Sequence, residues 1–282
     1  MGSLRLPDRA LLGLGLTVSV VLVTESLFSG RGLITTSLVV ASVVMFMASL
    51  WSALKLLGAW PTQWFVAVAL PIGWFAEQMG SSRGWFFGRY TYTDVLGWQL
   101  ANVPVVIPLM WFALVFIGYV MASLLLWQKP VLSRPSMGSG LLTILLTAMV
   151  VTAFDLGADP YFVFVLKAWI MEKRDGGWFG ETLQGFVGWM FIASVIAAAW
   201  MSRIRQLDEP APLKVNRLAV LVPLLTYGGE LVFQVIEGDP IEVRAVAVFA
   251  MGIPLLVCLS NAWRWARSPS DKGGEQAQEA VQ

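Results

Sequence analysis

The chain has 282 residues, 57% of them hydrophobic, and its mean hydropathy of +0.71 is typical of integral membrane proteins. Its net charge of +1 argues against nucleic acid as a partner. Histidine is absent and Cys258 is the one cysteine, which excludes an intrachain disulfide, His-ligated zinc, haem with a proximal histidine and histidine–carboxylate iron centres. We therefore expect no metal and no other cofactor, and proton chemistry falls to Asp, Glu, Tyr, Lys or water.

Apolar segments in chain order predict an all-α integral membrane protein with about eight transmembrane helices, each near the ~20 residues that cross the hydrocarbon core. They span roughly residues 10–28, 33–57, 64–79, 103–127, 139–158, 182–202, 216–236 and 243–264. No small-residue cleavage site follows the first, so we interpret it as a helix and not as a signal peptide. The third is weakest, because it is short and contains Pro71. Segment 161–171 is too short to cross and predicts a re-entrant or interfacial helix.

These spans form one expected transmembrane domain, residues 1–267, followed by a polar tail, 268–282, that we expect to be disordered. Of the 19 lysines and arginines, 12 fall on one side of the predicted topology, and they include those near both termini. Because positive residues concentrate on the cytoplasmic side, both termini are predicted to be cytoplasmic. Of the 18 carboxylates, 12 lie on the other side or at the outer ends of spans. The residues that could carry out proton chemistry are therefore concentrated on that side.

Two loops rich in glycine and aromatic residues lie on that non-cytoplasmic side. The segment 77–102 is unusually long and varied in composition for a connector. Residues 176–181, Gly-Gly-Trp-Phe-Gly-Glu, partly repeat its glycine and aromatic pattern. Glycine permits close backbone approach, and aromatic side chains suit a membrane–water boundary. The two structured loops therefore predict one shared site. The alternation of Tyr90 and Tyr92 with threonines also fits a short strand without chemistry.

Carboxylates in or beside the apolar spans are the candidate catalytic groups. Charged groups in a membrane are costly and mark function by default, and a carboxyl kept protonated in an apolar pocket is a ready general acid. Glu230 lies within its span, on one face with Tyr227 and Gln234. The full set of candidate carboxylates is Glu77, Glu230, Asp155, Asp159 and Asp94.

Structural roles compete with these catalytic ones. Glu77 would pair with Arg83 or Arg89 at the interface, and Asp155 and Asp159, just before a proline, would end a helix or begin a turn. A purely structural role is also open for Glu230, in the seventh span.

Two motif blocks between residues 70 and 190 resemble the CruF-type carotenoid 1′,2′-hydratases and bisanhydrobacterioruberin hydratases, a family of membrane carotenoid biosynthesis proteins. The first block reads Glu77, Gly80, Gly84, Phe87-Gly88-x-Tyr90-x-Tyr92, Gly97, Val103-Pro104, Pro108 and Trp111. The second reads Asp155-Leu156, Asp159-Pro160, Trp169, Gly176-Gly177-Trp178-Phe179-Gly180 and Gly185-Phe186-x-Gly188-Trp189. The chain departs from the family pattern at Glu181-Thr182 and at Gln184, where the family has a proline and an asparagine.

The resemblance implies a bacterial or archaeal membrane enzyme, a hydro-lyase that adds water to the terminal C1′=C2′ bond of a ψ-end carotenoid such as lycopene. Glu77 or Glu230 would protonate C2′, aromatic faces would stabilise a tertiary cation at C1′, and Asp155, Asp94 or a tyrosine would orient water. Expected partners are the carotenoid, water, the bilayer and other carotenoid-biosynthesis enzymes. Expected substrate-binding residues are Trp74, Trp85, Phe87, Tyr90, Tyr92, Trp98, Trp111, Trp178, Trp189 and Tyr227.

Two other classes of function also fit polar residues in membrane spans: a proton-coupled transporter and a non-catalytic protein that binds carotenoid or lipid. Transport is disfavoured because the Gly-Trp-Phe echo is too short to indicate an inverted repeat.

Overall fold

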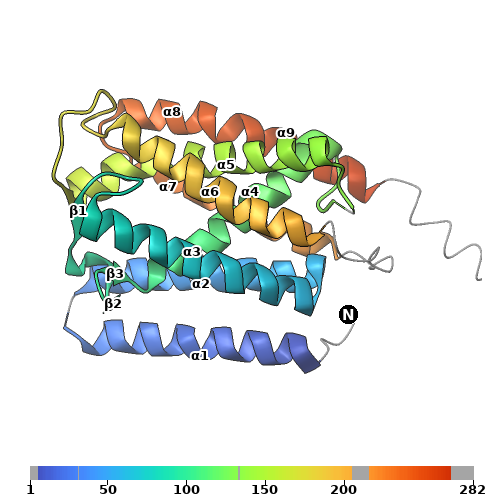
Figure 1. Cartoon of the computed structure of the whole chain (residues 1–282), viewed down its shortest axis with the longest axis horizontal. Coiled ribbons are helices and arrows are strands. Elements are labelled where there is room, and N and C mark those ends of the chain that lie inside the picture. Colours follow the sequence, from blue (N-terminus) through green and yellow to red (C-terminus); the bar gives the residue numbers. More distant parts are fainter. Residues whose placement is uncertain (1–5, 31, 133, 205–215, 268–282) are drawn as a thin grey trace, which may run out of the picture.

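A computed structural model describes residues 6–30, 32–132, 134–204 and 216–267 as a bundle of long helices with short strands at one end (Figure 1). The tail expected over residues 268–282 lies outside the described residues. The α-helices are α1 Leu6–Phe28, α2 Leu33–Leu57, α3 Ala59–Arg83, α4 Val106–Trp127, α5 Met137–Pro160, α6 Leu183–Ile204, α7 Arg217–Glu237, α8 Glu242–Ala250 and α9 Gly252–Ala266. The other elements are β1 Tyr90–Tyr92, the 3₁₀ turn η1 Asp94–Leu96, β2 Gln99–Leu100, β3 Val103–Pro104, the π-helix η2 Tyr161–Val165 and β4 Trp169–Met171.

Within the described residues, seven helical segments are long and apolar enough to cross a membrane. They are Pro7–Phe28, Leu33–Leu57, Val106–Trp127, Met137–Val165, Leu183–Ile204, Arg217–Glu237 and Glu242–Ala266. The all-α membrane fold is thus confirmed. The expected span that is missing from these seven is the third, 64–79, which corresponds to α3; this helix runs through Pro71 and is longer than predicted. Because α3 is not apolar enough to count among the seven, an eighth crossing stays a prediction.

The expectation of a separate re-entrant or interfacial helix over 161–171 was wrong. Its first half is the π-helix η2, which continues α5 directly, and its second half is strand β4. Aromatic and β-branched residues at Trp169–Met171 suit a strand, and β1 offers them a pairing partner. The predicted last span is divided into α8 and α9, with the break at Met251 and Gly252.

Helix α4 lies at the centre of the bundle. Its sequence is apolar on every face, which is typical of a helix surrounded by others, and its residues from Val106 to Leu124 are almost all buried. Aromatic rings from three helices pack around it, with Phe65 of α3 stacked on Trp200 of α6 at 4.9 Å and edge-on to Phe112 of α4 at 5.5 Å. The middle of the bundle around α4 is therefore filled mainly by apolar and aromatic side chains.

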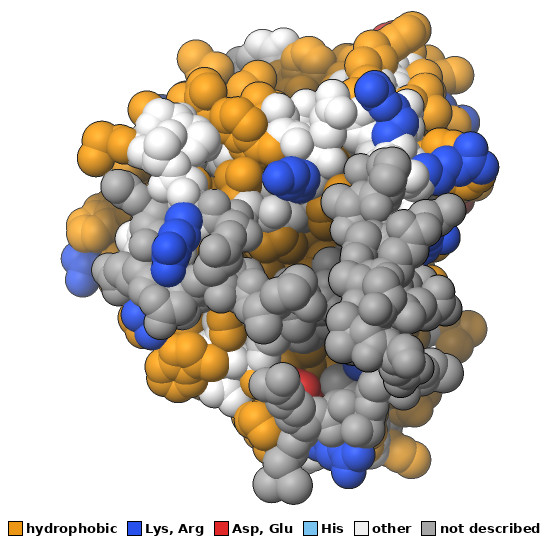
Figure 2. Space-filling model, turned by 90° about the vertical axis from the view of Figure 1, so that its right-hand side faces the viewer, with side chains coloured by type: hydrophobic (Ala, Val, Ile, Leu, Met, Phe, Trp, Pro, Cys, Tyr) orange, Lys and Arg blue, Asp and Glu red, His pale blue; other side chains and the backbone are white. Residues whose placement is uncertain are grey.

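Both predicted loops lie at the same end of the bundle, which we call the loop end (Figure 1). Strand β1 pairs antiparallel with β4, with Tyr90 opposite Met171 and Tyr92 opposite Trp169. Gln184, at the start of α6, donates a hydrogen bond of 3.3 Å to the Gly84 carbonyl. Lysine and arginine side chains lie around the opposite end (Figure 2). The loops therefore form one structured region, as expected, while their side of the membrane stays a prediction.

Candidate active site

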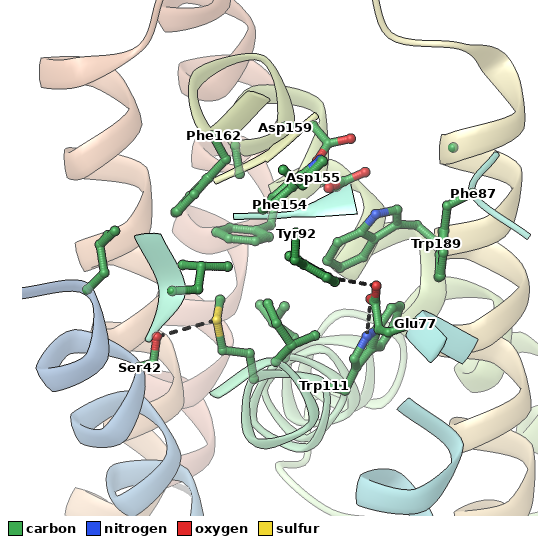
Figure 3. Close-up of a pocket in the computed structure, with 18 of the residues that line it drawn as sticks. Ser42, Glu77, Phe87, Tyr92, Trp111, Phe154, Asp155, Asp159, Phe162 and Trp189 are labelled. Atoms are coloured by element: carbon green, nitrogen blue, oxygen red, sulfur yellow. Dashed lines mark hydrogen bonds between the residues drawn. The ribbon is translucent and has the colours of Figure 1, made fainter. Parts of the chain in front are cut away.

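A cavity of about 230 Å³ lies under the strands of the loop end. Figure 3 shows Glu77 and Trp111 on one side of it and Ser42 of α2 on the other. Its lining is mostly apolar, with carboxyl groups from α3, α5 and α7 and two phenol groups from β1. The predicted site residues that line it are Glu77, Phe87, Tyr90, Tyr92, Trp111, Asp155, Asp159, Trp189 and Glu230.

The Glu77 carboxyl is 5% exposed and accepts hydrogen bonds from three side chains. The Trp111 indole N–H donates to Oε1 at 2.8 Å, and the Tyr92 hydroxyl donates to Oε2 at 2.8 Å (Figure 3). The Tyr90 hydroxyl also donates to Oε2. Sequence reasoning left an arginine partner open, but Arg89 instead lies 3.8 Å from Glu172. Glu77 is therefore held by neutral donors from β1 and α4.

Glycines allow the elements around Glu77 to approach closely. A Cβ at Gly73 would lie 2.8 Å from the Trp111 side chain, and one at Gly80 would lie 2.9 Å from the Tyr90 hydroxyl. Any larger residue would push Trp111 or Tyr90 away from the carboxyl. Burial, together with the nearby Glu77 carboxyl, raises the pKa of Tyr90 and Tyr92 well above the usual tyrosine value. Both phenols therefore keep their protons and act as donors.

Aromatic rings cover the cavity next to Glu77. Trp189 of α6 stacks on Trp111 with ring centroids 4.6 Å apart, and Phe87 lies 6.2 Å from Trp111. The negative faces of such rings attract a cation. A positive charge that develops beside Glu77 would therefore be stabilised.

A second group of carboxyls lies on α5 and the second loop. Asp155 and Asp159 are one helical turn apart and almost fully buried, and both line the cavity. The Glu181 carboxyl is 1% exposed and is close enough to interact electrostatically with both. Both Glu181 carboxyl oxygens and Asp155 Oδ2 have no hydrogen-bond partner among the described residues. Burial raises the pKa of Glu181 to about 7.

One face of α7 carries Tyr227, Glu230 and Gln234, which have different roles. Tyr227 donates to the Val150 carbonyl at 3.0 Å and Gln234 to the Phe154 carbonyl at 2.8 Å, so both hold α7 against α5. Glu230 is half-buried and lines the cavity. Of this face, only Glu230 reaches the cavity.

The remaining predicted residues lie elsewhere. Asp94, Trp85 and Trp98 are exposed on the loop end. Trp74 donates to the Leu100 carbonyl at 3.3 Å and lines a separate apolar cavity beside α1, and Trp178 donates to the Leu156 carbonyl at 2.9 Å. The structure gives Trp74, Trp178 and Tyr227 hydrogen bonds to backbone carbonyls and places none of these residues in the cavity.

Sequence reasoning missed several residues of the cavity wall. Phe162 stacks on Trp169 at 5.6 Å, and Trp169 lies edge-on to Tyr92 at 5.8 Å. The β-strand alternation of Trp169 and Met171 was the available signal for their shared side. Glu181 stood out as a departure from the family pattern but was not placed near Asp155.

The family model described as "Carotenoid biosynthesis protein" matches residues 34–258. A bisanhydrobacterioruberin hydratase of Haloarcula japonica is 34% identical to the chain over 120 residues. That alignment covers 42% of this chain and 38% of the relative, so it spans well under two thirds of the relative's length. No solved structure matches the chain significantly. The resemblance in the two motif blocks is thereby confirmed, and the protein belongs to the carotenoid biosynthesis protein family.

Proposed function

We propose that the protein hydrates the terminal C1′=C2′ double bond of a ψ-end carotenoid to give a tertiary alcohol. One observation carries this proposal. A buried carboxyl, Glu77, is held by three donors at the aromatic end of a mostly apolar cavity. The hydratase named among the relatives supports the same chemistry.

The proposed reaction begins with proton transfer from Glu77. The π electrons of the alkene take the proton at C2′, which leaves a tertiary cation at C1′ and a carboxylate at Glu77. Trp111, Tyr90 and Tyr92 each donate a hydrogen bond to that carboxyl, so they stabilise the anion as it forms. The stacked Trp111 and Trp189 rings face the cavity and stabilise the cation, by about 0.5–2 kcal/mol per favourable contact.

Water completes the reaction from the Asp155 and Asp159 wall. A water oxygen bonds to C1′, and one of its protons passes to a carboxylate of this pair. The unpartnered Asp155 Oδ2 is a free acceptor for that water. The aspartate pair then releases that proton to solvent and solvent returns a proton to Glu77, so alkene and water are consumed and the alcohol is formed without oxidation or reduction.

Pigment analysis in a lycopene-producing host tests this function. The wild-type protein should convert lycopene to a hydroxylated product, and Glu77→Gln should not, although it reaches the membrane. Glu237→Gln, at the exposed end of α7, is the matched control and should behave as wild type. Unchanged lycopene in cells that accumulate folded wild-type protein would contradict the proposal and favour a binding or transport role.

A further inference from the structure

The cavity is too small to enclose a carotenoid. Pockets that bury most of a drug-sized ligand measure about 300–1,000 Å³, and this one measures about 230 Å³. A carotenoid is about as long as the hydrocarbon core is thick, roughly 30 Å. If the proposed function holds, only the ψ-end fits inside, and the rest of the polyene must leave the cavity through an opening.

Burial of the lining residues indicates where that opening lies. At one end Glu77 and Trp111 are buried, with 5% and 1% of their surface exposed. On the α2 side, Leu38 is half-buried and Ala41 is exposed although both line the cavity, and Phe233 of α7 is half-buried. The cavity therefore runs from a closed polar end to an open apolar end between α2 and α7.

The packing of α2 against α7 explains why the opening lies in this half of the bundle. Far from the loop end, the Ser52 hydroxyl of α2 donates a buried hydrogen bond of 2.7 Å to the Ala219 carbonyl of α7. Nearer the loop end, Met45 of α2 and Phe233 of α7 both face the cavity. The two helices are thus joined at one end, with the cavity between them at the other.

We infer that this opening, the lateral mouth formed by Leu38, Ala41, Met45 and Phe233, holds the polyene chain of the substrate as it passes from the bilayer to Glu77. The inference rests on the proposed function. All four side chains are apolar, so they match an apolar chain. Glu230, one helical turn before Phe233 on α7, also lines the cavity. Both helices that form the mouth are long and apolar enough to span the membrane, so the mouth lies between two candidate membrane spans.

A bulky residue at the mouth tests the inference. Ala41→Trp should raise the KM for lycopene by about tenfold or more, because the indole occupies the path of the chain. The same variant should hydrate geranylacetone, a short molecule with the same terminal isopropylidene group, at the wild-type kcat. The matched control is Val44→Trp, at a residue 60% exposed on α2 that does not line the cavity. It should leave both substrates unaffected.

The outcomes separate the two proposals. An equal loss with both substrates in Ala41→Trp would show damage to the site itself and would overturn the lateral mouth. Wild-type kinetics with lycopene in Ala41→Trp would also overturn it, since the polyene would then take another path or the mouth would hold only a bilayer lipid. Failure of the wild-type protein to hydrate either substrate would instead contradict the proposed function.

Discussion

The loop end holds Glu77 and a second group of carboxyls, Asp155, Asp159 and Glu181, which differ in their partners; all of them except Glu181 line the cavity. Glu77 has both oxygens occupied by donors, two tyrosines and a tryptophan. Asp155 and Glu181, by contrast, leave three carboxyl oxygens without a hydrogen-bond partner among the described residues. In the first group, three donors surround the single carboxyl of Glu77. In the second group, carboxyls of α5 and of the second loop lie near one another.

This difference assigns complementary tasks within the proposed reaction. Donors that surround Glu77 stabilise the carboxylate that forms when this residue gives up its proton in the proposed reaction. The second group places the Asp155 and Asp159 carboxyls together on the cavity wall, where one of them can take the proton that the attacking water gives up. The predictions below test this division, from the largest expected effect to the smallest.

Replacing Glu77, the proposed acid, should have the largest effect on the rate of hydration. Glu77→Gln keeps the shape of the side chain but cannot act as an acid, so hydration should slow by about 10²–10⁴-fold. Purified protein and a ψ-end carotenoid in detergent give the rate. A loss smaller than about tenfold in folded protein would move the acid to another carboxyl.

Asp155 should partly replace Asp159 as the acceptor of the water proton, and the reverse, whereas no residue replaces Glu77. Asp155→Asn or Asp159→Asn alone leaves one carboxylate to accept the proton of water, so each should cost about tenfold, and the double variant should cost about a hundredfold or more. Rates of the two single variants and the double variant check this. A double variant no slower than the slower single variant, with the other single variant at the wild-type rate, would show that only one aspartate matters.

Deleting one donor to Glu77 should have an intermediate effect. Trp111→Phe keeps a ring against Trp189 but removes the N–H bonded to Oε1, a charge-assisted bond worth about 1.5–3 kcal/mol. We expect kcat to fall by about tenfold or more, with KM little changed. A change confined to KM would indicate that Trp111 only shapes the cavity.

Glu181 should produce the smallest effect, on stability. Its pKa is about 7 in the folded protein and about 4.3 in an unfolded chain. Between these values the folded state binds the extra proton, so this residue makes stability fall as pH rises from about 4.3 to 7. Glu181→Gln should therefore show a smaller decrease in melting temperature across that window. Parallel melting curves for the variant and the wild type would contradict the assignment.

The sequence predicted the class of fold because long apolar segments have few alternatives in a membrane, and it predicted the site loops because Gly-aromatic motifs stood out. It also singled out Glu77, but its Trp111 partner, though named, was not paired with it, because that bond joins α3 to α4 across 34 positions. Trp74 was expected to bind substrate, yet it lines a separate cavity beside α1. Which side of a helix meets a cavity depends on packing, which spacing does not determine.

Isotope incorporation tests the central claim most directly. Membranes that carry the protein, incubated without O₂ in ¹⁸O-labelled water, should convert a ψ-end carotenoid to an ¹⁸O-labelled tertiary alcohol. In deuterated water, one deuterium should appear at C2′, because a carboxyl such as Glu77 exchanges its proton with solvent before it protonates the alkene. Glu77→Gln should lose both labels together. An unlabelled alcohol, or a strict requirement for O₂, would contradict hydration by this site.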